Sequence, residues 1–468
     1  MRALLANMGF VLQMSGIFII IPIILAFVFN ETSAVIALFL AATTFFALGF
    51  MLNALCERRE LTFKQSCTLI VLVFVLLSFI GAIPYVYINV SAGGEDAAKI
   101  ITDGVFESAS GFTTTGFSVI NNLSAIPNSI LFYRGLTQFI GGIGVVLVLL
   151  AFFYPEAKLQ EFSRGMGFSK NQKIKKTFLL IISIYCTYTI VMIISGFVLG
   201  YHDVVNLASF IFSALSTGGF APFGDITTVA TQFPLNFILI FSMVLGATNF
   251  IVLAGLFKGK IKEFIKSEIS VFLIIAVFSV LITTIFFQLS VFDSVFHVIS
   301  FMSTTGFGYL PQYTDGLKLF FVFLMFVGGA SFSTAGGIKI YRFILLFKVT
   351  KKAVVDSITE QDTPVRLFGK EYTDAEIIQS LALVILMIMI IFASSFVVSA
   401  YGNYRPIDSI FDTTSAIATT GLSVGVAGPS LALELKWLFV FLMILGRVEI
   451  LAFLIMFSRK KEPIKQIA

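Results

Sequence analysis

The sequence is poor in charged residues, cysteine, histidine and tryptophan. Lys, Arg, Asp and Glu make up only 12% of its 468 residues, whereas 58% are hydrophobic and the mean hydropathy is +0.99. A soluble domain of this size needs far more charge to cover its surface, so that class is excluded. The three cysteines are scattered and the two histidines, His202 and His297, are not paired as metal ligands. We expect buried structural thiols (Cys56, Cys67 and Cys186) and two ordinary polar residues near helix starts.

Long apolar runs recur from one end of the chain to the other, which predicts an all-α polytopic membrane protein. The first run is long enough to span a bilayer and no small-residue cleavage pattern follows it, so it is not interpreted as a signal peptide. An even number of spans agrees with both termini on one side. Ten spans are predicted, at about 8–29, 33–55, 67–90, 129–153, 178–200, 235–257, 269–290, 318–348, 375–400 and 435–457.

The distribution of charge predicts the orientation. Basic residues cluster in alternate loops, at Arg58–Lys64, Lys158–Lys176, Lys258–Lys266 and Arg342–Lys370, and in the tail at Arg459–Lys465. The positive-inside rule places these loops and both termini in the cytoplasm. The opposite loops carry acids, which either raise the local cation concentration or simply keep those loops polar. The few basic residues in these opposite loops are Lys99, Lys318, Arg405 and Lys436. The acidic residues in them are Glu95, Asp96, Asp103, Glu107, Asp203, Asp225, Asp293, Asp315, Asp408 and Asp412.

A Thr-Gly stretch occurs four times, each time after an apolar segment too short to cross a membrane. The four copies align without gaps, with serine at the seventh position and glycine at the thirteenth. Because Asp and Asn are preferred N-caps, each copy predicts a capped half-length helix followed by an extended strand, in a fourfold internal repeat. The alignment starts at Asp103, Asn206, Asp293 and Asp408, and the stretches are Thr113–Phe117, Ser216–Phe220, Ser303–Phe307 and Ala418–Leu422.

Four re-entrant loops around one axis can point backbone carbonyls inward and replace the hydration shell of a small cation. Glycine permits the backbone torsions that this needs, and each half-helix directs its partially negative C-terminal end toward the axis. Oxygen ligands suit a hard cation that must also leave. The predicted cation-binding residues are Thr114, Thr115, Gly116, Phe117, Thr217, Gly218, Gly219, Phe220, Thr304, Thr305, Gly306, Phe307, Thr419, Thr420, Gly421 and Leu422.

Further motifs accompany the repeat: Tyr133-Arg134 with Gln138 and Gly141–Gly144, Gly328-Gly329 with Ser333–Lys339, and Gly446–Glu449. With the repeated M1–pore helix–filter–M2 unit, they make the chain resemble the Trk/Ktr/HKT superfamily of potassium transporters. The extra N-terminal hairpin makes it most similar to the bacterial TrkH-type membrane subunit. On this basis the chain divides into a two-helix hairpin (1–60) and four pore repeats (61–165, 166–262, 263–355 and 356–468), in a potassium-channel-like arrangement around a central pore.

The resemblance implies several properties. Potassium is the transported ion, with selectivity for it when all four filter glycines are present, and no organic cofactor is bound. The protein is a homodimer in the bacterial inner membrane, and its cytoplasmic segments Pro155–Lys176 and Thr350–Asp374 contact a cytosolic Rossmann-type nucleotide-binding regulatory subunit. Nucleic acid is not a partner. The fourth stretch, Thr419–Ser423, is closer to the Ktr version, which leaves a Trk or a Ktr regulatory partner open.

Two basic residues are expected within spans, where charge is costly and usually functional or paired. Arg447 is predicted about midway along the last span, and Glu449 is too close in sequence to face it on a helix. The resemblance indicates an arginine facing the pore below the filter; the alternative is a salt bridge between helices. Lys339 ends a glycine-rich run where the helix should unwind, either as an intramembrane gate or as a packing face. The predicted gate residues are Gly328, Gly329, Gly336, Gly337, Lys339 and Arg447.

The leading interpretation is therefore potassium uptake through a regulated, channel-like pore. A sodium-permeable or weakly selective monovalent cation transporter is the first alternative. A secondary transporter for an organic solute is less favoured, because it needs two symmetry-related halves and this chain has four like-oriented repeats. An enzyme is not predicted, since the sequence has no P-loop, no paired catalytic acids in a soluble domain and no Ser/His/Asp set. Coupling to protons or sodium is left open.

Overall fold

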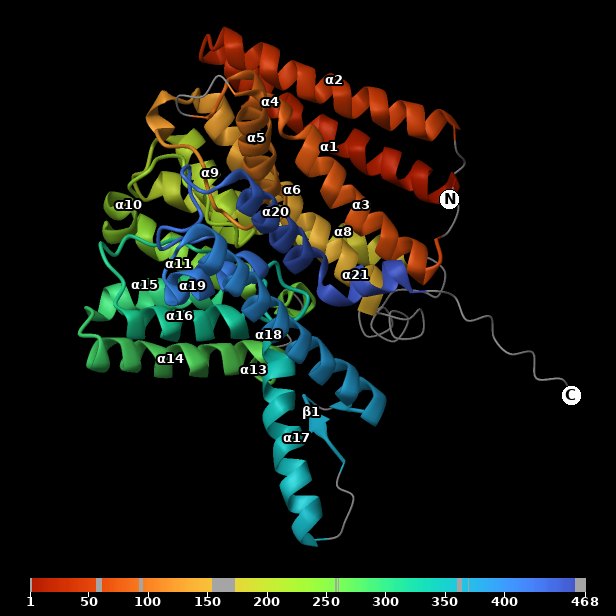
Figure 1. Cartoon of the computed structure of the whole chain (residues 1–468), viewed down its shortest axis with the longest axis vertical. Helices are drawn as coiled ribbons and strands as arrows, with labels where there is room; N and C mark the ends of the chain where they lie inside the picture. The colour runs from red at the N-terminus through yellow and green to blue at the C-terminus, as the bar shows by residue number, and fades with distance from the viewer. Residues whose placement is uncertain are drawn as a thin grey trace, which may run out of the picture.

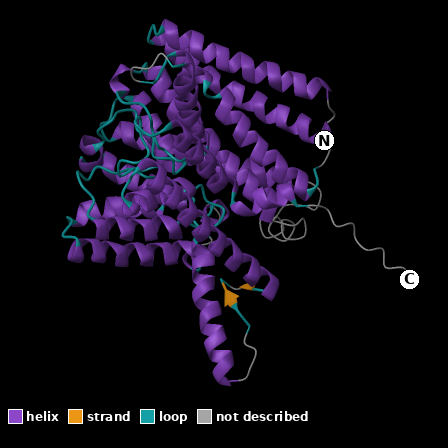
Figure 2. Ribbon diagram, in the orientation of Figure 1, coloured by secondary structure: helices purple, strands orange, loops and turns teal. Residues whose placement is uncertain are grey.

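The computed structural model describes residues 2–55, 61–91, 96–153, 173–256, 259, 261–359, 364–368 and 370–458. The described chain is predominantly helical, which confirms the all-α class (Figure 2). The strands in this part are β1 (Arg366–Leu367) and β2 (Lys370–Glu371), which pair antiparallel. They lie beside the long helix α17 (Ile340–Thr359), which projects from the helical body (Figure 1). Cys56, Glu95, most of the basic loop Lys158–Lys176 and the basic tail Arg459–Lys465 fall outside the described residues.

Within the described residues, six of the ten predicted spans are helices that are long and apolar enough to cross a membrane as they stand. The first two form the N-terminal hairpin, and the others are the first helices of the four repeats. The six are α1 (Arg2–Val28), α2 (Thr32–Leu55), α3 (Phe63–Ile80) continued by α4 (Ile83–Tyr87), α8 (Lys173–Val198), α14 (Glu268–Phe286) and α18 (Asp374–Gly402).

The second helices of the repeats differ from one another. Only the first, α6 (Asn128–Phe153), is continuous. The predicted spans over 235–257 and 435–457 are not continuous helices: each is a pair of helices, bent by 110° and 96° respectively. Asn249 caps the new helix at the first bend, and Glu449 takes a φ of +62° at the second. The pairs are α11 (Leu235–Ala247) with α12 (Phe250–Leu256), and α20 (Leu433–Val448) with α21 (Ile450–Phe457).

The third repeat shows the break that its glycines predicted. Helix α16 (Asp315–Val327) ends at Val327 and α17 begins at Ile340, so residues 328–339 form a loop within the predicted span. We call this segment the intramembrane loop. Shorter helices complete the described chain: the 3-10 turn Leu123–Ala125, α10 (Thr227–Thr231) and α13 (Ile261–Ile265).

The four half-length helices are present, but their predicted caps are wrong. The side chains of Asp96, Asp203 and Ser290 cap the first three, and Arg405 precedes the fourth without a capping bond. Asn206, Asp293 and Asp408 instead lie in the first helical turn, where the two aspartates complement the helix dipole; Asp103 lies deeper in its helix. We call these helices the pore helices: α5 (Ala97–Phe112), α9 (Val204–Leu215), α15 (Val291–Met302) and α19 (Pro406–Ile417).

Buried ion pairs explain two basic residues in the predicted outer loops. Lys436 of α20 lies 2.5 Å from Asp103 of α5, and both side chains are 1% exposed. Lys318 of α16 lies 2.6 Å from Asp408 of α19. Each pair joins the second helix of one repeat to the pore helix of the next, with the fourth repeat joined to the first. Since these acids are compensated, they do not act as free negative charges on the outer face.

The N-terminal hairpin is attached to the first repeat through Glu31. One carboxylate oxygen accepts the backbone N–H of Asn128 at 2.7 Å, and the other accepts that of Ser129 at 3.0 Å and its hydroxyl. These N–H groups open α6, and a helix N-terminus binds anions because its first N–H groups have no partner within the helix. The turn of the hairpin therefore serves as the cap of a pore-repeat helix.

Replacing Glu31 with Ala should lower the melting temperature of the detergent-solubilised protein. Loss of the carboxylate leaves the first N–H groups of α6 without their acceptor, at a cost of ~1–3 kcal/mol. Glu371→Ala is the control, because Glu371 forms an exposed ion pair with Arg366, and such pairs contribute little. Equal melting temperatures for the two variants would contradict the capping role.

Candidate functional site

The four predicted Thr-Gly stretches meet at the C-terminal ends of the pore helices. We call residues 113–117, 216–220, 303–307 and 418–422 the filter loops. In the first, a Cβ atom added to Gly116 would lie 2.2 Å from the carbonyl oxygen of Gly218 in the second loop. A Cβ atom added to Gly219 would lie 2.2 Å from the oxygen of Thr305 in the third. Each glycine therefore lies against the backbone of the following repeat.

The same contact continues around the remaining loops. A Cβ atom on Gly306 would lie 1.8 Å from the oxygen of Thr420, and one on Gly421 would lie 1.9 Å from that of Thr115. The fourth loop thus contacts the first, and the four form a closed ring in chain order. Since all four glycines also have φ between +78° and +105°, both space and backbone conformation exclude a larger residue there.

A threonine two residues before each glycine has a left-handed backbone, with φ between +52° and +56°. β-branched residues rarely adopt this conformation. In each repeat the N–H of the next residue bonds back to the carbonyl of the seventh-position serine at 2.8–2.9 Å, which ends the pore helix in a Schellman-type turn. Four strained residues at one aligned position indicate a constraint specific to this site. They are Thr114, Thr217, Thr304 and Thr419.

The seventh-position serines support the filter loops from behind. Ser110 Oγ accepts the N–H of Gly116 at 3.0 Å. The hydroxyls of Ser300 and Ser415 donate to the carbonyl oxygens of Phe307 at 2.7 Å and Leu422 at 2.9 Å. The Ser213 hydroxyl has no partner among the described residues. The serine that marked the repeat in the sequence therefore has a structural role in three copies.

The second filter loop is held differently, by two residues of α6. The amide of Gln138 donates to the Gly218 oxygen at 2.5 Å and accepts the Phe220 N–H at 3.2 Å. Arg134 donates to the Ala221 oxygen at 3.2 Å, and its guanidinium carbon lies 4.0 Å from the centre of the Phe220 ring. Both residues belonged to a sequence motif that had no assigned role.

The intramembrane loop lies directly against the filter loops. Its Gly336 N–H donates to the Thr304 hydroxyl at 2.7 Å, and a Cβ atom on Gly336 would lie 2.0 Å from the oxygen of Ala418. Gly328 and Gly337 have φ of +70° and +73° and pack on each other and on Gly336. The glycines thus form a compact turn, and the predicted break in this span is confirmed.

The intramembrane loop forms hydrogen bonds with neighbouring segments through both its side chains and its backbone. The Thr334 hydroxyl lies 3.0 Å from the oxygen of Leu215 and 2.9 Å from that of Gly246, at the bend after α11. Glu268 of α14 accepts the Ser331 N–H at 2.7 Å. The loop is therefore held on the second repeat and on the first helix of its own repeat.

Two basic residues lie at this level. The Lys339 ammonium donates to the Ala335 carbonyl and is 5% exposed. Arg447, 3% exposed, donates to the oxygen of Thr334 in the intramembrane loop at 2.7 Å and to that of Gly141 in α6 at 3.0 Å. Arg447 lies near the end of α20, not midway along a single helix as predicted, and it bridges the third repeat and the first.

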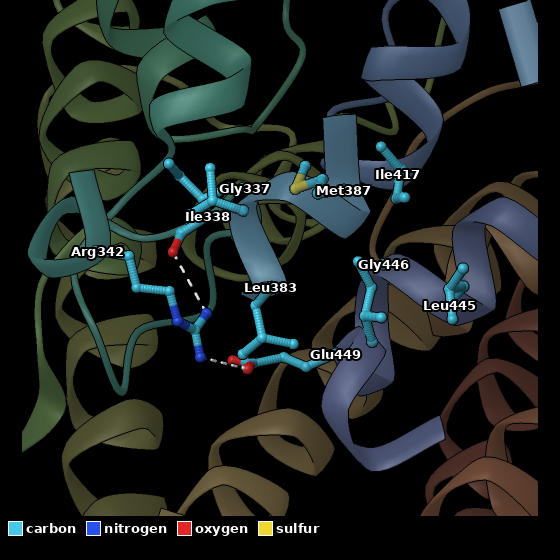
Figure 3. Close-up of a pocket in the computed structure, with 11 residues that line it drawn as sticks. Gly337, Ile338, Arg342, Leu383, Met387, Ile417, Leu445, Gly446 and Glu449 are labelled. Atoms are coloured by element: carbon cyan, nitrogen blue, oxygen red, sulfur yellow. Dashed lines mark hydrogen bonds and ion pairs between the residues drawn. The ribbon is translucent and has the colours of Figure 1, made fainter. Parts of the chain in front are cut away.

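The alternative of an interhelical salt bridge applies to Glu449 and not to Arg447. Glu449 pairs with Arg342 at the start of α17 at 3.0 Å, and Arg342 also donates to the oxygen of Ile338 at 3.3 Å. Figure 3 shows this pair beside a cavity of about 40 Å³ that reaches Gly446 and Ile417. The pair joins the end of the intramembrane loop to the bend in the last helix, and sequence reasoning missed Arg342.

Comparisons with known proteins identify the family to which this chain belongs. The profile of the TrkH family, described as cation transport protein, matches residues 32–266 and 264–466. An uncharacterized cation transporter of Methanocaldococcus jannaschii is 29% identical, over 98% of this chain and 95% of that protein. The Trk system potassium uptake protein TrkH of Halomonas elongata is 27% identical, over 98% of each. The crystal structure of the potassium transporter TrkH from Vibrio parahaemolyticus shares the fold, with a TM-score of 0.83 at 20% identity and 98% coverage of both chains. This chain belongs to the TrkH family of cation transport proteins.

Proposed function

We propose that the chain takes up potassium through a pore whose selectivity depends on backbone oxygens of the four filter loops. The closed ring of glycine contacts carries this proposal, because it brings one loop from each repeat to a common axis. Relatives named as potassium uptake proteins over nearly the whole chain support the choice of ion. The buried loops offer oxygen and no thiolate or imidazole, which suits a hard, weakly held cation.

The hydrogen bonds separate the candidate carbonyl ligands into those that already have a side-chain partner and those that do not. Phe307 and Leu422 direct their carbonyl oxygens to serine hydroxyls, and Gly218 directs its oxygen to Gln138. The oxygens of Thr115, Thr305 and Thr420 have no such partner among the described residues and lie against the filter glycine of the preceding repeat. We therefore infer that these three oxygens are central ligands of the cation, with the equivalent second-repeat position less regular.

We propose that the intramembrane loop and Arg447 form the gate. The loop contacts the filter loops directly, and the guanidinium, bonded to two carbonyls, adds positive charge beneath them. A cation leaving the filter meets both the backbone of the loop and a like charge, and like charges at close range in a poorly solvated pore repel strongly. Conduction would require the Arg447 and Thr334 contacts to separate.

We propose further that the protein is a homodimer in the bacterial inner membrane with both termini in the cytoplasm. The basic loops support the orientation. The long helix α17 with its β hairpin projects from the body (Figure 1) and offers a surface for a cytosolic Rossmann-type nucleotide-binding regulatory subunit. The other predicted contact, Pro155–Lys176, lies mostly outside the described residues.

The test is cation flux into proteoliposomes that contain the purified chain, with potassium, rubidium, sodium and lithium compared under the same gradient. We expect potassium and rubidium to enter readily and sodium and lithium to be excluded. Equal entry of sodium and potassium would favour the weakly selective alternative. Flux of none of the four ions, from protein that is monodisperse and correctly inserted, would contradict the proposed function of the isolated chain.

A further inference from the structure

A second aligned position supports the filter loops, and its residue types differ in every repeat. Counted from the starts of the aligned copies in the same way as the seventh-position serines, the residue at the fourth position is near the middle of the pore helix. The residue at the sixteenth position follows the filter loop. The fourth-position residues are Glu107, Phe210, His297 and Asp412, and the sixteenth-position residues are Val119, Pro222, Tyr309 and Val424.

In three repeats the fourth-position side chain accepts the backbone N–H of the sixteenth residue. The distances are 2.8 Å from Val119 N to Glu107 Oε1, 2.9 Å from Val424 N to Asp412 Oδ1 and 3.2 Å from Tyr309 N to His297 Nε2. All three acceptor residues are 0% exposed. Two carboxylates of different length and one imidazole thus accept the same hydrogen bond at one place. We call this bond the fourth-position brace.

The second repeat lacks both halves of the brace. Its fourth-position residue is Phe210, which has no acceptor, and its sixteenth-position residue is Pro222, which has no N–H to donate. Gln138 and Arg134 hold that filter loop from α6 instead. The acceptor is therefore missing only where the donor is missing too, as expected if a buried, unpaired N–H in the other loops would be costly.

The hydrogen bonds around His297 define the tautomer of its imidazole. Its Nδ1 lies 2.8 Å from the backbone oxygen of Asp293, which can only accept, so Nδ1 carries the proton. Nε2 then has a free lone pair and accepts from Tyr309. The side chain is a neutral imidazole used as an acceptor, in the same role as the carboxylates of Glu107 and Asp412. The expectation that His297 is an ordinary polar residue at a helix start is wrong.

We propose that Glu107, His297 and Asp412 are positioning residues for ion discrimination. Each fixes the strand that leaves its filter loop, and so keeps the carbonyl oxygens of that loop at the spacing that favours potassium. This inference rests on the proposed function, because it requires the filter loops to select the ion. It adds the residues that keep three of the four loops in shape, none of which contributes an oxygen to the ring of carbonyls.

The test compares variants of His297 by the potassium-to-sodium flux ratio in proteoliposomes. His297→Phe copies the second repeat's side chain but leaves the Tyr309 N–H unpaired, and we expect the ratio to fall about tenfold, equivalent to ~1.4 kcal/mol. His297→Glu copies the first repeat and should restore most of the ratio. His202→Phe is the matched control, because His202 is exposed and lies before its pore helix; its ratio should equal that of the unmodified protein.

The outcomes separate this inference from the proposed function. An unmodified protein that does not prefer potassium would overturn the function itself. An unmodified protein that prefers potassium, with His297→Phe equally selective, would overturn the brace alone. Elution as a single species in size exclusion and measurable potassium flux identify a folded His297→Phe variant. If that variant does not fold, a His297→Glu variant that folds yet has lost its potassium preference would overturn the brace.

Discussion

Gly116→Ser should remove most of the preference for potassium over sodium. A Cβ atom at Gly116 would lie 2.2 Å from the oxygen of Gly218, which is backbone and cannot rotate away. The first and second filter loops must therefore move apart. Forcing atoms into a packed site costs ~1–3 kcal/mol, so a shift of the flux ratio by roughly tenfold or more is expected. The measurement is competitive potassium and sodium flux in proteoliposomes.

Gly200→Ser is the control for this substitution. Gly200 has a φ of +108°, close to the +105° of Gly116, but a Cβ atom there would meet nothing within 4 Å. Both variants therefore introduce serine at a positive φ, and only Gly116→Ser introduces a contact with another filter loop. If Gly116→Ser keeps the unmodified flux ratio, the ring of glycine contacts does not determine selectivity.

Shortening the intramembrane loop within Ser331–Gly336 should raise cation flux without changing ion preference. This segment lies against the filter loops through Gly336 and holds Arg447 through the Thr334 carbonyl. Its removal opens the path below the ring while the four filter glycines keep their contacts. We expect potassium flux to rise roughly tenfold, the change that ~1.4 kcal/mol produces, with the potassium-to-sodium ratio unaltered.

Substitutions at Thr334 give a milder version of the same test. Thr334→Val keeps the shape of the side chain but removes the hydroxyl that lies near the oxygens of Leu215 and Gly246. This should weaken the attachment of the loop and raise flux less than shortening does. Thr334→Ser retains the hydroxyl and should conduct as the unmodified protein does. Unchanged flux in both the shortened and the valine variants would argue against the loop as a gate.

The sequence predicted the structural features that depend on local residue patterns. Hydropathy located the long helices, and the fixed spacing of Ser110 and Gly116 with their equivalents located the filter loops. Glycine content located the break in the third repeat. The caps were wrong because Asn206, Asp293 and Asp408 satisfy the composition of a cap while lying in the first turn. Aspartate is favourable both at the cap and in the first turn, and asparagine is a preferred cap, so the residue type alone does not distinguish the two places.

Other features depend on tertiary contacts that residue types alone do not predict. The bends at Thr248 and Glu449 occur within continuous apolar runs, so the hydropathy of the sequence does not reveal them. The fourth-position brace is carried by Glu, His and Asp, and its donor is a backbone N–H. An aligned column containing such different residues appears variable, although its bond is the same. Arg134 and Gln138 act on a loop of another repeat, which only the tertiary fold reveals.

The intramembrane loop belongs to one repeat alone, and this has a consequence for architecture. A ring of four identical subunits presents every segment four times, so a plug of this size on the central axis would collide with its own three copies. Joining the four quarters in one polypeptide removes that restriction. One quarter can supply the plug, another the arginine that is hydrogen-bonded to it, and a third the unbroken helix to which that arginine also donates. The covalent linkage of the repeats thus permits an asymmetric closure inside a nearly symmetric ring.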